Sequence, residues 1–121
     1  MVDFKKLQKD VYQNKVNKGF NVTDLNMEFC LAYAELGEAY MAWLKKKDDL
    51  GEELADVAIY LMGISEILGI DLESEIVNKI DKNSKRVYKT INGVLTKIEN
   101  SLYDKISRKS NGIKMLKLIE E

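Results

Sequence analysis

The stretches Ala34-Glu35-Leu36-Gly37-Glu38 and Glu53-Leu54-Ala55-Asp56 decide the fold of this chain. In each stretch two acids stand three residues apart, so on a helix they share one face and lie about one turn from each other. Between the stretches, Lys45-Lys46-Lys47 is followed by Asp48-Asp49. Cations stabilise the end of one helix and anions the start of the next. The sequence therefore predicts two helices joined by a turn.

The two acidic pairs come level if these helices fold back on each other as an antiparallel hairpin. Residues at one level then have a constant index sum, which is 91 both for Glu35 with Asp56 and for Glu38 with Glu53. Asp56 is also the only carboxylate or basic residue in the apolar run 54–64. Burying an unpaired carboxylate costs several kcal/mol or forces it to take a proton. The pattern therefore predicts four carboxylates at one level of the hairpin.

Such a cluster favours a divalent cation. Unpartnered carboxylates repel and raise one another's pKa values, and a cation removes that repulsion. Oxygen ligands without His or Cys suit Mg²⁺, Mn²⁺ or Ca²⁺ rather than Zn²⁺. We predict a metal site with the ligands Glu35, Glu38, Glu53 and Asp56. The alternative interpretation is an acidic face exposed to water.

Composition narrows the class of protein. The 121 residues are 45% hydrophobic and 32% charged, which is typical of one folded domain. The net charge of −1 gives no general electrostatic reason to expect nucleic-acid or membrane binding. The chain has no His, which excludes Ser-His, Cys-His and His-zinc chemistry, and its single Cys30 is expected in the core. With no signal peptide or transmembrane run visible, we expect a cytoplasmic protein.

The apolar spacing predicts an all-α fold: a four-helix bundle over residues 1–89 and a helical extension over 90–121, within a single domain. Expected helix signals are a break at Gly19, a cap at Thr23 or Asp24, and a stop at Leu68-Gly69. Asp49 with Glu52 has the spacing of a capping box, and Asp71 is expected to cap the fourth helix. The extension is expected to hold a fifth helix from about residue 91 and a short sixth from about 113.

The apolar faces of the second and third helices predict where each is buried. The second helix carries one column at helical spacing, expected against the core: Leu25, Phe29, Ala32, Leu36, Ala39 and Trp43. The third helix is apolar on nearly every side, which predicts burial all round. We therefore expect a second subunit to cover part of it, in a homodimer or a homotetramer.

The fourth helix supplies donors for phosphate. Lys79, Asn83 and Arg86 continue the column that begins with Leu72 and Ile76. A Mg²⁺ held by carboxylates commonly binds through substrate phosphates, and a water on the metal would then be the nucleophile. The chain has no glycine-rich phosphate loop, so helices must hold the phosphates. Tyr60 and Trp43 are placed to stack on a base, or else are core residues.

These residues carry a resemblance to the MazG-like all-α nucleoside triphosphate pyrophosphohydrolases. Glu35-Leu36-Gly37-Glu38 and Glu52-Glu53-Leu54-Ala55-Asp56 resemble the paired ExxE and ExxD motifs of that family. The segment from Lys79 to Arg86 is similar to its K-x-x-x-N-x-x-R motif, and the three motifs occur in the family's order between about residues 20 and 88. The resemblance implies Mg²⁺-dependent cleavage of a nucleoside triphosphate between the α and β phosphates.

The resemblance also assigns roles. It implies that Glu35, Glu38, Glu53 and Asp56 hold the metal, and that Lys79, Asn83 and Arg86 contact phosphate or sugar. The base would contact Trp43, Tyr60 and Phe20.

The chain departs from the family at one position. Many members have a Glu directly before the first motif Glu, where this chain has Ala34, so we name no general base. This departure motivates an alternative function, a helical module that senses nucleotides without hydrolysing them. A third interpretation, motivated by the apolar third helix, is a plain oligomerisation protein.

Overall fold

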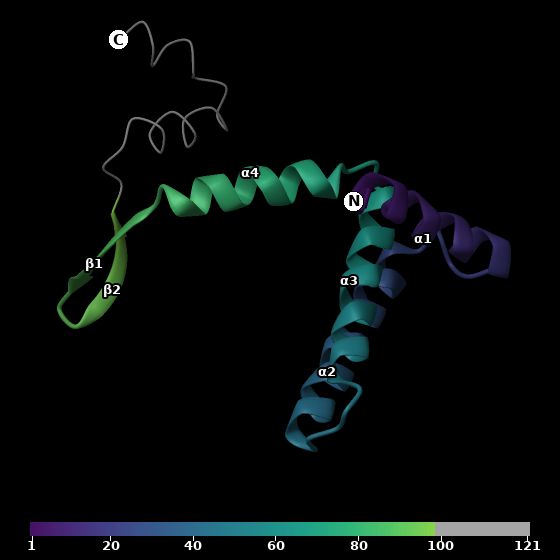
Figure 1. Cartoon of the computed structure of the whole chain (residues 1–121), viewed down its shortest axis with the longest axis horizontal. Helices are drawn as coiled ribbons and strands as arrows, with labels where there is room; N and C mark the ends of the chain where they lie inside the picture. The colour runs from purple at the N-terminus through teal and green to yellow at the C-terminus, as the bar shows by residue number, and fades with distance from the viewer. Residues whose placement is uncertain (99–121) are drawn as a thin grey trace, which may run out of the picture. The chain divides into compact units, whose positions relative to one another are not determined.

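The computed structural model describes residues 1–98, which form four helices and a β-hairpin (Figure 1). The elements are α1 (Phe4–Lys18), α2 (Leu25–Leu44), α3 (Leu50–Ile67), α4 (Leu72–Ser84), β1 (Val87–Ile91) and β2 (Val94–Ile98). The chain divides into two compact units, residues 1–76 and 77–121, and α4 begins in the first and ends in the second. The predicted mostly helical fold is confirmed at this level.

Aspartate side chains cap three of the helices, at Asp24 and Asp71 as predicted and at Asp3, which was not predicted. Asp3 and Asp24 accept hydrogen bonds from the backbone N–H groups of Lys6 and Met27, each at 3.1 Å. Asp71 does the same for the backbone N–H of Ser74. These caps satisfy donors that have no partner inside the helix.

The predicted capping box at the start of α3 is wrong. Asp49 makes no side-chain cap hydrogen bond, and its ψ of 14° lies far from the extended value at Asp3 and Asp24. At the other side of this turn, the end of α2 is closed by a backbone hydrogen bond, in which the N–H of Lys47 donates to the carbonyl of Ala42.

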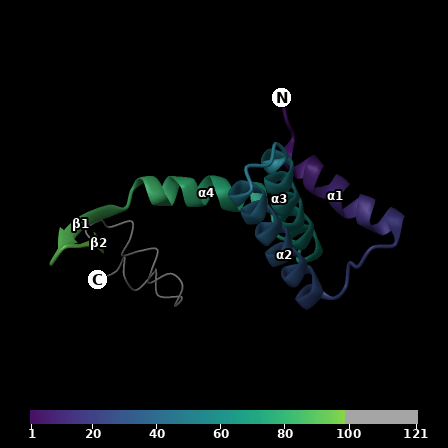
Figure 2. The ribbon, with the colours of Figure 1, turned by 90° about the horizontal axis from the view of Figure 1, so that it is seen from below.

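In the first unit, α2 and α3 form the predicted antiparallel hairpin, and α1 packs against α3 (Figures 1 and 2). Gly63 allows this approach of α1. A Cβ at this position would meet Cε of Lys15 at 3.0 Å, closer than nearly all real contacts. Gln8 of α1 joins the far end of α3, donating to Glu66 at 3.0 Å and to the carbonyl of Ile70 at 2.8 Å.

The centre of the first unit is polar as well as apolar. Its buried apolar residues are few: Ala39, Ala42, Met62 and Ile64. The largest fully buried side chain is Glu28, which is 1% exposed and accepts a hydrogen bond from Nζ of Lys15. Its other oxygen accepts from Asn21 at 3.1 Å, and Lys15 Nζ lies 4.9 Å from the centre of the Tyr60 ring. An ion pair therefore joins α1, α2 and α3 at the core.

The predicted burial of the apolar columns is wrong within one chain. Of the α2 column only Ala39 is buried, whereas Phe29, Leu36 and Trp43 are exposed. The face of α2 that packs on α3 is the one carrying Glu28, Glu35 and Ala42, because the acids face the hairpin partner.

Cys30 of α2 is exposed rather than a core residue, so that prediction is wrong. In α3, residues 62–65 are buried within the chain, and the cover of its other sides by a second subunit stays a prediction. The chain thus presents a large apolar surface, yet none of the helices in residues 1–98 has the length and hydropathy needed to cross a membrane.

The predicted fifth helix is wrong for residues 91–98, which belong to the hairpin (Figure 1). Strands β1 and β2 pair antiparallel, with Ile91 opposite Val94. Asn92 and Gly93 form the turn with positive φ angles of 52° and 78°. An Asn-Gly pair adopts this conformation readily, and its twist matches that of the flanking strands. The remainder of the predicted fifth helix and the predicted sixth helix lie outside the described residues.

Candidate metal and substrate site

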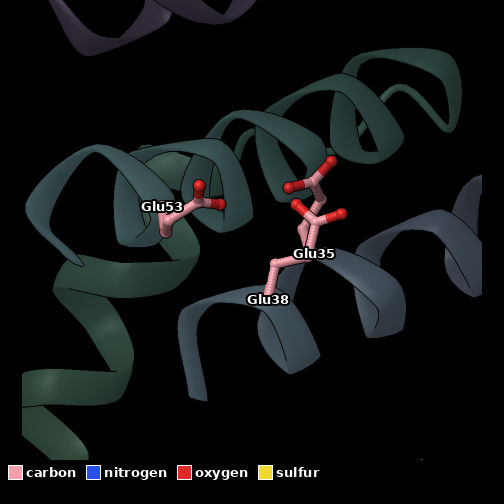
Figure 3. Close-up of side chains that lie close together, drawn as sticks. All are labelled: Glu35, Glu38 and Glu53. Atoms are coloured by element: carbon pink, nitrogen blue, oxygen red, sulfur yellow. The ribbon is translucent and has the colours of Figure 1, made fainter. Parts of the chain in front are cut away.

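Three of the four predicted metal ligands come together between α2 and α3 (Figure 3). Glu35 and Glu38 extend from α2 and Glu53 from α3, and one carboxylate oxygen of each lies within 4.8 Å of the others. The antiparallel hairpin brings Glu38 level with Glu53, as the index sum predicts, because the turn lies halfway between them. Glu38 is exposed, whereas Glu35 and Glu53 are half-buried.

The fourth predicted ligand, Asp56, lies near this group without joining it. It is half-buried one turn after Glu53 on α3. Its charge contributes to raising the pKa of both Glu35 and Glu53, which places it within electrostatic reach of the cluster. The three-glutamate group is therefore the geometric centre, and Asp56 flanks it on the side away from the turn.

Within residues 1–98, no ion pair joins Glu35, Glu38 or Glu53 to a basic side chain, although Lys47 borders the same hollow as Glu38 and Glu53. One oxygen each of Glu35 and Glu53 is buried without a hydrogen-bond partner among the described residues. Burial, followed by the negative charge of Glu38, raises the pKa of Glu35, and the same two causes in the same order raise the pKa of Glu53. Buried oxygens without partners are the kind of group that a bound cation satisfies.

The burial of the Glu35 carboxylate and its repulsion by Glu38 are unfavourable in the metal-free protein. Glu35→Gln is therefore expected to raise the stability of that protein in a pH-dependent way. Because the pKa of Glu35 is raised by folding, the folded state holds more protons than the unfolded chain at pH values above the ordinary 4.5. Stability therefore falls as the pH rises through that range. We expect the melting temperature of Glu35→Gln in EDTA to exceed that of the wild type at pH 7 and to match it at pH 4.

The control is Glu52→Gln, which removes one charge from an exposed neighbour on α3. It should leave the melting temperature nearly unchanged at both pH values. A gain from Glu35→Gln that is equally large at pH 4 would contradict the electrostatic explanation, because the carboxyl is protonated there in both states.

An open cavity of about 520 Å³ lies between α1 and α3 in the first unit, and its lining includes Phe20 and Tyr60. The structure thus brings two of the three predicted base-binding residues into one cavity. Burial and then the charge of Glu35 raise the pKa of Tyr60, and Asp56 adds to this effect. Tyr60 therefore connects the cavity to the acidic cluster.

Sequence reasoning missed the polar residues of this cavity. Asp10 and Asn14 line it from α1, beside Leu7 and Val11. Asn14 is exposed, and no hydrogen bond of its side chain is found within the described part of the chain, so its amide can bind water or another molecule. The spacing of 10 and 14 puts both on one helix face, but that pattern also fits an ordinary exposed face.

Trp43, the third predicted base contact, lies apart from this cavity. It stacks on Tyr40 with ring centres 6.1 Å apart and borders a separate hollow at the turn with Lys46 and Lys47. Because Tyr60 and Trp43 lie on opposite sides of the acidic cluster along the hairpin, one base cannot touch both within a single chain.

The predicted phosphate-binding residues belong to the second unit. Lys79 and Asn83 are exposed on α4, and the half-buried Arg86 follows the end of that helix. The charge of Arg86, then burial, Lys82 and Lys97, lower the pKa of Lys79. Sequence reasoning missed Lys97, because residues 91–98 were expected to be helical.

Comparison of the chain with protein-family models, with curated proteins and with solved structures finds no match. The resemblance to the MazG-like enzymes therefore rests on the three short motifs alone.

Proposed function

We propose that this chain is a Mg²⁺-dependent nucleoside triphosphate pyrophosphohydrolase of the MazG-like type. It would cleave a nucleoside triphosphate between the α and β phosphates, consuming one water and releasing a nucleoside monophosphate and pyrophosphate. Its role would be to remove unwanted or excess nucleotides in the cytoplasm. The observation that carries this proposal is the group formed by Glu35, Glu38 and Glu53, in which two buried oxygens have no hydrogen-bond partner within residues 1–98.

The donor set fits Mg²⁺ or Mn²⁺. It consists only of carboxylates, which are the ligands hard cations take in proteins. Glu35, Glu38 and Glu53 would hold the ion, and Asp56, whose charge acts on Glu35, is proposed as the fourth ligand. A cation held there supplies positive charge to offset the negative charge that grows on the phosphates during cleavage.

Each of the two units also has groups suited to one part of a nucleotide. Phe20 and Tyr60 offer aromatic surface to a base in the cavity, and Asn14 offers both a donor and an acceptor to its edge. Lys79, Asn83 and Arg86 offer donors to the phosphates. With Ala34 at the position before the first motif acid, no side chain is assigned as the general base.

The test is release of pyrophosphate from a panel of common and modified nucleoside triphosphates, with Mg²⁺ and with Mn²⁺. We expect release from at least one of them and none in EDTA. Absence of release across the panel with both metals would overturn the enzyme proposal. If nucleotide with Mg²⁺ then raised the melting temperature while staying intact, the sensor function would take its place.

We also infer that the active form is a homodimer or a homotetramer. Exposed apolar side chains follow the heptad spacing of alternating four and three residues along α2: Phe29, Tyr33, Leu36, Tyr40 and Trp43. A monomer rarely exposes so continuous an apolar stripe, and this spacing is that of a helix-to-helix seam. A second copy of the chain presenting the same stripe would cover it.

Leu36→Lys tests this inference by light scattering coupled to gel filtration. The wild type should have at least twice the mass of one chain, and the variant should shift toward the monomer because burying the charge is unfavourable. Met27→Lys is the control: Met27 is 49% exposed against 52% for Leu36, but it lies on another side of α2. A monomeric wild type would contradict the inference.

A further inference from the structure

The two units of the chain have opposite charge. Residues 1–76 contain fifteen acids and eight basic residues, a net charge of −7. Residues 77–98 contain six basic residues and a single acid, Asp81, a net charge of +5. Asp81 is paired with Lys85 at 3.0 Å. The overall net charge of −1 conceals this separation, which leaves the second unit suited to an anion.

Four of these cations converge on one place within the second unit. Lys79 and Lys82 are one turn apart on α4, and Arg86 follows the helix just before β1. Across the hairpin, Lys97 is opposite Tyr88. Side chains alternate along a strand, so residue 86 falls on the same face as Tyr88 and Lys97.

The electrostatics agree with this placement. The charges of Arg86, Lys82 and Lys97 all lower the pKa of Lys79, with that of Arg86 the largest. Like charges affect one another in this way only at short range in water. We name these four residues, Lys79, Lys82, Arg86 and Lys97, the basic cluster.

One donor of the basic cluster lacks an acceptor: Nε of Arg86 is buried without a hydrogen-bond partner among the described residues. Lys82, Arg86 and Lys97 are all half-buried, so they lose part of their hydration, and within residues 77–98 no ion pair with a carboxylate is found for them. Several cations spread over a helix and a hairpin suit an anion with more than one charged group, and a guanidinium matches phosphate oxygens in particular.

Lys79 and Arg86 are already assigned to phosphate under the proposed function. We propose that Lys82 of α4 and Lys97 of β2 extend that set, so that the basic cluster binds a phosphoanhydride chain, as found in pyrophosphate and in nucleoside triphosphates, with Lys97 in direct contact. The assignment of the nucleotide as the natural ligand rests on the proposed function. The proposal of a pyrophosphate site does not rest on the proposed function, because the site is formed by residues of the second unit alone. Lys97 lies beyond the part of the chain that resembles the MazG-like enzymes.

The experiment measures binding of inorganic pyrophosphate to the full chain by calorimetry, in EDTA and at low ionic strength. We expect Lys97→Gln to weaken binding about tenfold, the loss expected for one charge-assisted hydrogen bond. The matched control is Lys89→Gln. Lys89 is opposite Thr96 and therefore lies on the other face of the hairpin. The same change of charge there should alter the affinity less than about twofold, since distant exposed charges are screened.

The outcomes separate this proposal from the enzyme proposal. Loss of pyrophosphate binding in Lys97→Gln alone supports the site, even if no nucleotide is hydrolysed. Equal weakening by Lys89→Gln and Lys97→Gln would overturn it, because binding would then follow net charge only. Failure of the wild type to bind pyrophosphate would also overturn the proposal. So would a single-stranded oligonucleotide that binds more tightly than pyrophosphate and whose binding Lys97→Gln weakens as much as it weakens pyrophosphate binding.

Discussion

Glu38→Gln is expected to abolish pyrophosphate release, lowering the rate by at least about a hundredfold, which corresponds to about 2.7 kcal/mol of lost transition-state stabilisation. Glu38 supplies one of the three oxygens that lie within 4.8 Å of one another, and it is the exposed member of the group. The amide keeps the shape of the side chain but removes the charge that a divalent cation requires. The measurement is release of pyrophosphate with saturating nucleotide and Mg²⁺.

Loss of activity must be separated from loss of fold. Glu38→Gln relieves repulsion, because the charge of Glu38 raises the pKa of Glu35 and of Glu53. Its metal-free melting temperature should therefore equal or exceed that of the wild type at pH 7. Glu52→Gln, with the same change one residue from Glu53, should keep full activity. Full activity in Glu38→Gln would show that the acidic cluster is not required for the reaction.

The largest effect on stability is expected from Glu28→Ala, which should lower the free energy of unfolding by about 3–5 kcal/mol. Glu28 is 1% exposed and accepts hydrogen bonds from both Lys15 and Asn21. Removing it leaves the buried Lys15 ammonium without its ion-pair partner, 4.9 Å from the centre of the Tyr60 ring. Urea unfolding followed by circular dichroism gives the measurement.

The double variant Lys15→Met with Glu28→Ala isolates the electrostatic part of this loss. Because it removes both charges together, it should be clearly more stable than Glu28→Ala alone. The control is Lys6→Ala, which breaks the exposed pair with Asp10 and should cost less than about 1 kcal/mol. A loss below about 1 kcal/mol in Glu28→Ala would show that the buried pair contributes little.

The acidic cluster was open to prediction because its geometry is local. Two periodicities and the position of one turn are enough to bring Glu38 level with Glu53, and helix hydrogen bonds enforce both. The cavity beside Tyr60 was not open to prediction in the same way. It depends on how α1 crosses α3, which is set by the close approach at Gly63 and the ion pair of Lys15 with Glu28.

The hairpin shows where the periodicity argument failed. Ile91, Leu95 and Ile98 have helical spacing, but Asn92-Gly93 between β-branched and aliphatic residues is a strong turn signal. If the Asn92-Gly93 turn signal is given more weight than the apolar spacing, both strands are predicted. Lys97 is then expected on the face of the hairpin that also carries Tyr88.

By itself, the sequence determined the four helices, most of their ends and the level at which the acids meet, because these follow from hydrogen bonding and side-chain spacing within short segments. Only the tertiary structure decided which face of α2 is buried. Apolar residues line one face and acids the other, and it is the acidic face, with Glu28 paired to Lys15, that packs inside the chain. The choice depends on a partner thirteen residues away in α1, and no local pattern encodes such a pairing.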